Sequence, residues 1–372
     1  MEQNGIDFLV VEATQRYMGG YIRYLVDVPA SNYLTQAVLG LDGDATLVTH
    51  GPPGQSDART EQRSNAPLNT IRVPSFPTVY WQDGWQGEKV ADVIGRSKHH
   101  TVGLVGLGSM SAALYETLKK ELPSSDIVNA SSLIDEVRMM KSEEEMKLLV
   151  ETAELHERSY QVAKKAIRLG RTALEAIHEV RTQQILEGSE EQQLFIKFGP
   201  YGAPTLEQHS GGNWFVRRPF KQGDIVDILI ESSGRGGYWY DLRRFLCFGS
   251  PPKELLEAHK ISREASRLMA LASRDGATCA SALAASDDYL ASQKCPRETR
   301  ICGHGQGTDL LERPLIRNEE DVVLKTGMVL ALHPMAKMPK SMISLSDDYR
   351  VTPSGAVPLV SSLQHDDELE IL

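Results

Sequence analysis

The sequence is short of cysteine, of aromatic residues and of long apolar runs. No stretch approaches the roughly 20 consecutive apolar residues that a membrane-spanning helix needs, and the amino terminus lacks the basic start and the small-residue cleavage site of an export signal. The four cysteines are scattered without a Cys-x-x-Cys pair. This favours reduced thiols over a disulfide framework or a zinc ribbon. We therefore expect a cytoplasmic protein.

Positive charge is scarce relative to negative charge. Lysine and arginine together number 40 against 50 aspartates and glutamates, so the formal net charge is −10 at pH 7. Nucleic acids and anionic membrane surfaces carry the same sign of charge and would be repelled. We therefore expect a small-molecule substrate, with neither nucleic acid nor membrane as a partner.

What the sequence does contain suffices for two globular cores. Its 372 residues exceed one typical domain, and 41% hydrophobic with 24% charged residues is ordinary for a soluble protein. Short apolar strands such as residues 6–11 alternate with amphipathic segments, which predicts an α/β first region. A capping box at Ser142 and Glu145 begins a long helix, and strands separated by Gly and Pro turns follow, which indicates an α+β region. We expect domains at residues 1–138 and 139–372.

Five segments of the second region resemble, in order, the motifs of the creatinase, prolidase and aminopeptidase P family. They are MKSEEEMKLL at 140–149, FKQGDIVDILI at 220–230, GGYWYDLRRFLCFG at 236–249, GHGQGTDLLERP at 303–314 and LKTGMVLALHPM at 324–335. The amino-terminal half, beginning GIDFLVV, is similar to the smaller creatinase-type domain. The resemblance implies an α/β creatinase-type domain followed by an α+β pita-bread catalytic domain, in a homodimer.

Metallopeptidases of this family bind two divalent ions through two aspartates, one histidine and two glutamates. Hard oxygen ligands and one imidazole can bridge paired ions and acidify a shared water. By resemblance, the second aspartate corresponds to Asp241 and the histidine to His304. The first aspartate falls on Leu229 when counted forward from the Gly-Asp pair that begins the strand, and on Ile230 when counted back from Asp241. Either position is apolar.

Other carboxylates lie near the first missing ligand. Because side chains alternate along a strand, Asp227 and Glu231 share a face with Leu229 but not with Ile230. If the forward count gives the register, one of them is a candidate substitute. The sequence leaves both registers open.

Three further positions depart from the family pattern. His333 stands in place of the first glutamate, and the last glutamate falls on Ser346, beside Asp347. The second histidine of the family, seven residues after His304, is replaced by Leu311. Burying a divalent ion without compensating charge costs at least several kcal/mol. We therefore expect a degenerate metal site, and an enzyme that is not a standard dimetal Xaa-Pro peptidase.

Three functions are compatible with this altered site, and the one we expect needs no cofactor. It is a creatinase-like, non-peptidase hydrolase that cleaves a C–N bond of a small amino-acid-like or guanidino/amide substrate. A histidine would activate water, and general-base catalysis typically contributes about 10²–10⁴-fold in rate. His209 is the first candidate base, and His304 and His333 are the others, with Asp241 retained beside them.

The two alternatives keep the same scaffold. In one, Asp241, His304 and His333 hold a single Fe(II), Zn or Mn ion, a two-histidine, one-carboxylate set suited to a lyase, a hydrolase or a non-haem iron oxygenase. In the other, the chain is a catalytically inactive binding module that has kept the fold.

Polar and aromatic side chains near the motifs are candidate substrate contacts in each case. A planar guanidinium can clamp a carboxylate through two hydrogen bonds, which would suit an anionic substrate. Structural support of the hairpin is an equally good interpretation of Tyr238 and Arg244. The candidate contacts are Trp214, Tyr238, Tyr240, Arg244, Arg313 and Arg350.

Overall fold

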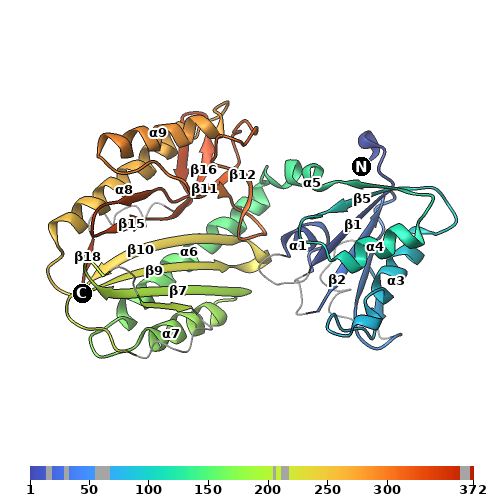
Figure 1. The fold of residues 1–372 in the computed structure, drawn as a ribbon, viewed down its shortest axis with the longest axis horizontal. Coiled ribbons are helices and arrows are strands. Elements are labelled where there is room, and N and C mark those ends of the chain that lie inside the picture. Colours follow the sequence, from blue (N-terminus) through green and yellow to red (C-terminus); the bar gives the residue numbers. More distant parts are fainter. Residues whose placement is uncertain (14–18, 29–32, 55–67, 204–206, 211–217, 361–368) are drawn as a thin grey trace. The chain divides into compact units, whose positions relative to one another are not determined.

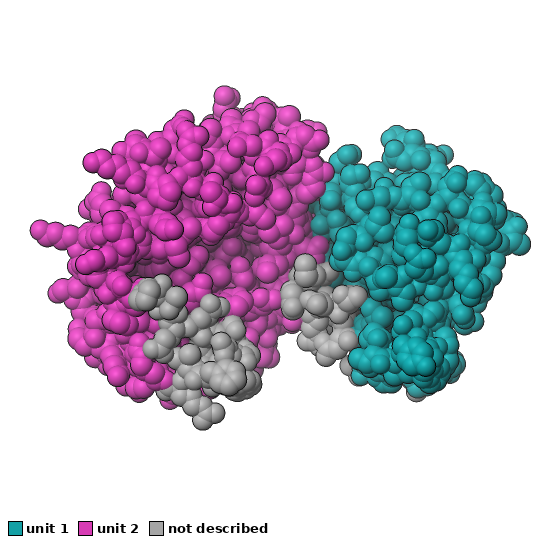
Figure 2. All heavy atoms as spheres, in the orientation of Figure 1, with its two compact units in different colours: residues 1–138 teal, residues 139–372 magenta. Residues whose placement is uncertain are grey.

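The computed structural model describes residues 1–13, 19–28, 33–54, 68–203, 207–210, 218–360 and 369–372. The chain forms two compact units, residues 1–138 and 139–372 (Figure 2). Within the described ranges, no helix has the length and apolar character to cross a bilayer.

The first unit is an α/β domain built on one mixed sheet. Its strands follow the order β4-β3-β2-β1-β5-β6, with β1 antiparallel to β2 and parallel to β5. Alternation along β1 sends Leu9 and Val11 into one apolar cluster and Val10 into another, so both faces of the sheet are covered. The strands are β1 Phe8–Ala13, β2 Thr35–Gly40, β3 Ala45–His50, β4 Leu68–Val73, β5 Thr101–Val105 and β6 Asp126–Asn129.

The helices of this unit are short and amphipathic. They are α1 Gly20–Val26, α3 Trp85–Ile94, α4 Ala112–Glu121 and α5 Ser131–Arg138, with 3-10 turns η1 Glu2–Asn4 and η3 Tyr80–Gln82.

The second unit contains two five-stranded sheets (Figure 1). The first has the order β18-β10-β9-β7-β8, with β7 Glu191–Pro200, β8 Glu207–Ser210, β9 Asp224–Ser233, β10 Trp239–Cys247 and β18 Glu370–Ile371. The second has the order β12-β11-β13-β16-β17, with β11 Gly303–Gly305, β12 Glu312–Leu315, β13 Val329–Leu332, β16 Asp347–Thr352 and β17 Gly355–Pro358. A backbone bridge between Arg243 and Ser346 joins β10 to the beginning of β16.

Helices cover the outer faces of these sheets. The apolar cluster of the first sheet includes Ala153 and Ile177 from its two helices, and that of the second includes Met269 and Leu283. The helices are α6 Glu143–Ala166, α7 Ala173–Leu186, α8 Lys253–Ala272 and α9 Cys279–Ser292. A 3-10 turn, η4 Arg235–Gly237, joins β9 to β10, and β14 Met335–Lys337 pairs with β15 Met342–Ser344. The α/β plus α+β class and the predicted capping box of Ser142 and Glu145 are confirmed.

The pairing of β9 with β10 determines which residues face the interior of the second unit. Ile230 lies opposite Leu242, and Glu231 lies opposite Asp241. Ile230 is fully buried in the apolar cluster between the first sheet and helices α6 and α7, which we call the helix-covered cluster. Because directly opposed residues of antiparallel strands share a face, Asp241 shares its face with Glu231 and Leu229, and not with Ile230.

Acid should destabilise the second unit through His156 on α6. This imidazole is fully buried, its Nδ1 donates to the Thr152 carbonyl oxygen at 2.8 Å, and its Nε2 has no partner. Burial lowers the pKa of His156 to about 4 from the ordinary 6.5. Between pH 6.5 and about 4, His156 is therefore protonated in the unfolded chain but remains neutral in the folded chain. The free energy of unfolding is therefore not reduced by this group above pH 6.5. It falls by roughly 3 kcal/mol as the pH drops towards 4, at 1.36 kcal/mol per pKa unit.

Urea unfolding at pH 7, 6 and 5 measures this slope. His156→Gln, which can still donate to Thr152 but does not titrate, should reduce the slope, whereas His178→Gln on the exposed face of α7 should not. An unchanged slope in His156→Gln would show that this group is not the acid-sensitive one.

Candidate functional site

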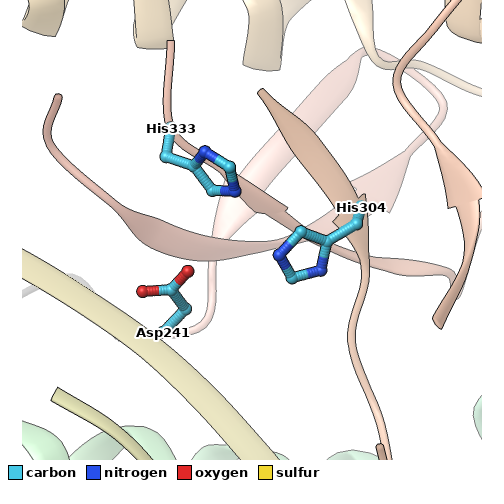
Figure 3. A group of neighbouring side chains, drawn as sticks. All are labelled: Asp241, His304 and His333. Carbon is cyan, nitrogen blue, oxygen red and sulfur yellow. The ribbon is translucent and has the colours of Figure 1, made fainter. Parts of the chain in front are cut away.

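Three potential metal ligands converge in the second unit. Asp241 extends from β10, His304 from β11, and His333 from the residue after β13 (Figure 3). One ligand atom from each lies within 4.8 Å of the other two. The two imidazole centroids are 5.3 Å apart, with an interplanar angle of 59°. Segments separated by up to 92 positions in sequence therefore meet at one point.

Glycines and backbone hydrogen bonds hold both histidines in place. A Cβ on Gly305 would lie 2.1 Å from the Arg313 carbonyl oxygen, so glycine is required where β12 approaches β11. The Nδ1 of His304 donates to the Gly305 carbonyl oxygen at 3.0 Å, which leaves the lone pair on Nε2. The backbone nitrogen of His333 donates to Cys302 at 2.8 Å, and its carbonyl oxygen accepts from Ser344 at 2.7 Å.

Burial sets the charge state of the group. It lowers the pKa of His304, and it lowers that of His333 well below the ordinary value, with His304 and Arg300 adding to the effect. Both imidazoles are therefore neutral, which is the form that binds metal. Burial also raises the pKa of Asp241, against the opposing influence of Ser346 and Arg243.

These residues fit a divalent ion. One carboxylate with two imidazoles is a donor set found around single zinc or non-haem iron ions with open positions. The Oδ1 atom of Asp241 is buried without a hydrogen-bond partner. An unsatisfied buried polar atom typically costs about 1–3 kcal/mol, and a coordinated cation would remove that cost.

Three of the expected substrate contacts instead interact with other residues of the second unit. The Tyr238 hydroxyl donates to Glu145 at 2.9 Å. Arg244 donates to the Ser346 carbonyl oxygen at 2.9 Å and to the Asp347 carboxylate at 2.6 Å. Tyr240 is buried in the helix-covered cluster, on the face of β10 opposite to that of Asp241. The structural interpretation of these residues therefore accounts for their positions.

The remaining candidates do not join the three ligands. Arg313 pairs with Glu320 and with Asp321. Arg350 is exposed on β16 and lines a different pocket, at the amino-terminal end of α6. The backbone of His209 lies on β8 opposite Ile196. The side chain of His209 and all of Trp214 lie outside the described residues.

Motif counting missed a carboxylate on β16. It pointed to Ser346 and to the adjacent Asp347, but Asp347 turns towards Arg244. Asp348 is fully buried, and neither of its carboxylate oxygens has a hydrogen-bond partner. Asp348 lies opposite Ala331, which in turn lies opposite His304, so Asp348 shares a face with His304. Strand alternation from Ser346 is the sequence signal that could have identified it.

The fold and the three converging ligands define a two-domain pita-bread protein with a site suited to a metal ion. Residues 147–353 match the sequence profile described as Metallopeptidase family M24, and residues 1–140 match that of the Creatinase/Prolidase N-terminal domain. The chain therefore belongs to the metallopeptidase family M24.

Curated relatives include two kinds of dipeptidase. The chain is 26% identical over 262 residues to an Xaa-Pro dipeptidase of Lactobacillus delbrueckii subsp. lactis, covering 69% of each chain. It is 28% identical over 233 residues to the probable dipeptidase PepE of Mycobacterium tuberculosis, covering 62% of this chain and 60% of that one.

Solved structures support the same fold over nearly the whole chain. The prolidase from Pyrococcus furiosus superposes with a TM-score of 0.76 at 19% identity, covering 96% of this chain and 97% of the other. The dipeptidase PepE from Mycobacterium ulcerans gives a TM-score of 0.76 at 22% identity, covering 100% and 94%.

These comparisons correct two expectations. The chain was expected to be a creatinase-like, non-peptidase hydrolase, but its family is one of metallopeptidases and its relatives are named dipeptidases. The expectation that it needs no cofactor is wrong for the same reason. One alternative drawn from the sequence already named Asp241, His304 and His333 as the ligands of a single ion, and the structure brings one ligand atom from each within 4.8 Å of the other two.

Proposed function

We propose that this chain is a metal-dependent peptidase that hydrolyses dipeptides, with a divalent ion held by Asp241, His304 and His333. The convergence of these three ligand atoms within 4.8 Å carries the proposal. Membership of a metallopeptidase family, and relatives named dipeptidases, support the reaction class.

Each residue of this set has a distinct part. When bound, the ion would polarise the scissile carbonyl and acidify a water molecule. Asp241 supplies the negative charge that retains a cation. His304 presents Nε2 because its Nδ1 is committed to the Gly305 carbonyl oxygen. His333 presents a neutral ring from a backbone fixed by two hydrogen bonds.

The proposed site differs from the standard ligand set of the family. His333 and Ser346 stand where the resemblance requires two glutamates, and Leu229 or Ile230 stands where it requires an aspartate. Leu311 stands where it requires a second histidine. Imidazole in place of carboxylate at 333 makes the position softer, which favours Zn or Fe(II) over Mg. We therefore propose a metal preference shifted towards these ions.

The proposal also covers compartment and assembly. All four cysteines are buried free thiols, which supports the cytoplasm. The family resemblance supports a homodimer, so a solution mass of twice that of one chain is expected by analytical ultracentrifugation.

Metal loading and turnover test the proposed function together. The purified chain, stripped with chelator and reloaded with Zn, Fe(II) or Mn, should bind metal and hydrolyse members of a panel of dipeptides with and without proline in the second position. Activity should disappear on chelation and return with one of the three ions. Turnover that survives complete removal of metal, or no hydrolysis of any dipeptide by the loaded protein, would overturn it.

A further inference from the structure

A cavity beside α8 lies on the face of the second sheet that points away from the metal ligands. It has a volume of about 930 Å³, within the range of pockets that hold small organic molecules. Asp347 and Tyr349 of β16 line it. Because side chains alternate along a strand, these two residues point to the opposite face from Asp348, which shares its face with His304. The cavity is therefore separate from the proposed metal site.

The helix side of this cavity is strongly basic. Lys260, Arg263 and Arg267 line it from α8, at intervals of three and four residues that place side chains on one face of a helix. Arg244 of β10 is the fourth cation of the lining. The chain as a whole has a net charge of −10, so this local concentration of positive charge runs against its composition.

Two carboxylates of the lining balance only part of this charge. Asp347 accepts a hydrogen bond from Arg244 at 2.6 Å. Glu264 accepts two from Arg267, at 2.8 and 2.7 Å. Among the described residues that line the cavity, these are the acidic ones, against four cations. The lining therefore carries two more positive than negative charges, which a dianion would balance.

The rest of the lining offers a hydroxyl group and an apolar wall. Ser266 is buried, and its hydroxyl oxygen has no hydrogen-bond partner among the described residues. A buried hydroxyl without a partner is unfavourable, and an anionic oxygen would accept from it. Leu271 of α8 and Val357 of β17 line the cavity with 54% and 42% of their surfaces exposed. An apolar group of a ligand would cover them.

We propose that this cavity binds a small organic phosphate, with the phosphate group among the basic side chains of α8 and an extended apolar part against Leu271 and Val357. A phosphate monoester carries about −1.5 to −2 charge at pH 7, which matches the excess positive charge. Guanidinium groups bind phosphate oxygens through paired hydrogen bonds. Leu271 lies roughly 12 Å along α8 from Arg263, at about 1.5 Å per residue, so the apolar part must be extended.

This site is independent of the proposed function, because none of Asp241, His304 and His333 lines the cavity. Calorimetric titration of the full, zinc-loaded chain with hexyl phosphate tests it, at constant ionic strength. Hexyl phosphate should bind once per chain, at least about tenfold more tightly than inorganic phosphate, because burial of the alkyl chain adds to the affinity. Affinity should be unchanged after the metal is removed with chelator.

Two sets of variants divide the contributions. Lys260→Gln combined with Arg263→Gln should weaken hexyl phosphate at least about tenfold, since two charged contacts to the phosphate are lost. Leu271→Asn should reduce the preference for hexyl phosphate over inorganic phosphate and leave the affinity for inorganic phosphate unchanged. Lys253→Gln combined with Arg274→Gln is the matched control. It also removes two exposed positive charges, one at each end of α8 and both outside the lining, and should preserve binding.

Thermal melts identify any variant that fails to fold. If hexyl phosphate does not bind the unaltered chain, or binds the Lys260 and Arg263 variant as tightly as the control, the cavity is not a phosphate site. If binding disappears on chelation, the phosphate is held by the metal ion instead, and the proposal is overturned while the proposed function stands.

Discussion

Asp241→Asn should strip the protein of metal and of dipeptide hydrolysis. Asp241 is the sole anionic member of the three-residue cluster, and a neutral amide is a much weaker ligand for a divalent ion. Loss of a charged buried partner typically costs about 3–5 kcal/mol, and each 1.4 kcal/mol is tenfold in Kd. The affinity for Zn²⁺ should therefore fall by roughly 10²–10³-fold, and turnover should fall with it. Isothermal titration calorimetry and a dipeptide assay measure the two effects.

The thermal stability of the metal-free protein, unlike its metal affinity, should not fall in Asp241→Asn. The Asp241 carboxylate is buried, and its Oδ1 atom has no partner, so the metal-free variant should melt no lower than the metal-free parent. Glu179→Gln, on the exposed surface of α7, serves as the control and should preserve both affinity and activity. Unchanged Zn²⁺ affinity in Asp241→Asn would remove this residue from the metal site.

Ile230→Asp should prevent the second unit from folding, whereas Leu229→Asp should be tolerated. Ile230 is fully buried against α6 and α7 in the helix-covered cluster. An uncompensated carboxylate there costs several kcal/mol, and loss of the isoleucine packing about 2–5 kcal/mol more. The sum is comparable to the whole stability of a typical domain, about 5–15 kcal/mol. Leu229 lies on the other face, shared with Asp241, and is only partly buried.

Circular dichroism and thermal melts of the two variants decide between the two faces. We expect cooperative melting for Leu229→Asp and none, or a strongly lowered Tm, for Ile230→Asp. If Ile230→Asp folded well and Leu229→Asp did not, Leu229 rather than Ile230 would lie on the face of β9 that the helices cover.

The fold could be predicted from sequence because five motifs occur in one order, and because local signals such as the Ser142 and Glu145 capping box act over a few residues. Motif spacing likewise pointed to Asp241, His304 and His333 as possible ligands. Their convergence depends on how two sheets meet, and the structure supplies it.

Counting residues between motifs could not predict which face of the sheet an individual strand residue occupies. A count that is wrong by one residue moves a side chain to the opposite face of the sheet. Leu229 and Ile230 were therefore equivalent in sequence until the β9–β10 register separated them. The same alternation explains why Asp348 was overlooked. Counting drew attention to Asp347, one residue after Ser346, which is directed at Arg244. Asp348, two residues after Ser346, lies on the same face as His304.

The roles of Tyr238 and Arg244 could not be inferred for a different reason. Their partners, Glu145 and Asp347, lie 93 and 103 residues away in the chain. No local pattern reports such pairs, so the sequence left substrate contact and structural support equally open for these two residues.

Anomalous diffraction from crystals soaked in Zn²⁺, recorded on both sides of the zinc absorption edge, tests the metal site most directly. We expect an anomalous peak at bonding distance from Asp241, His304 and His333 in the same molecule. A map without density among these three side chains, from crystals in which zinc is bound elsewhere, would contradict the account.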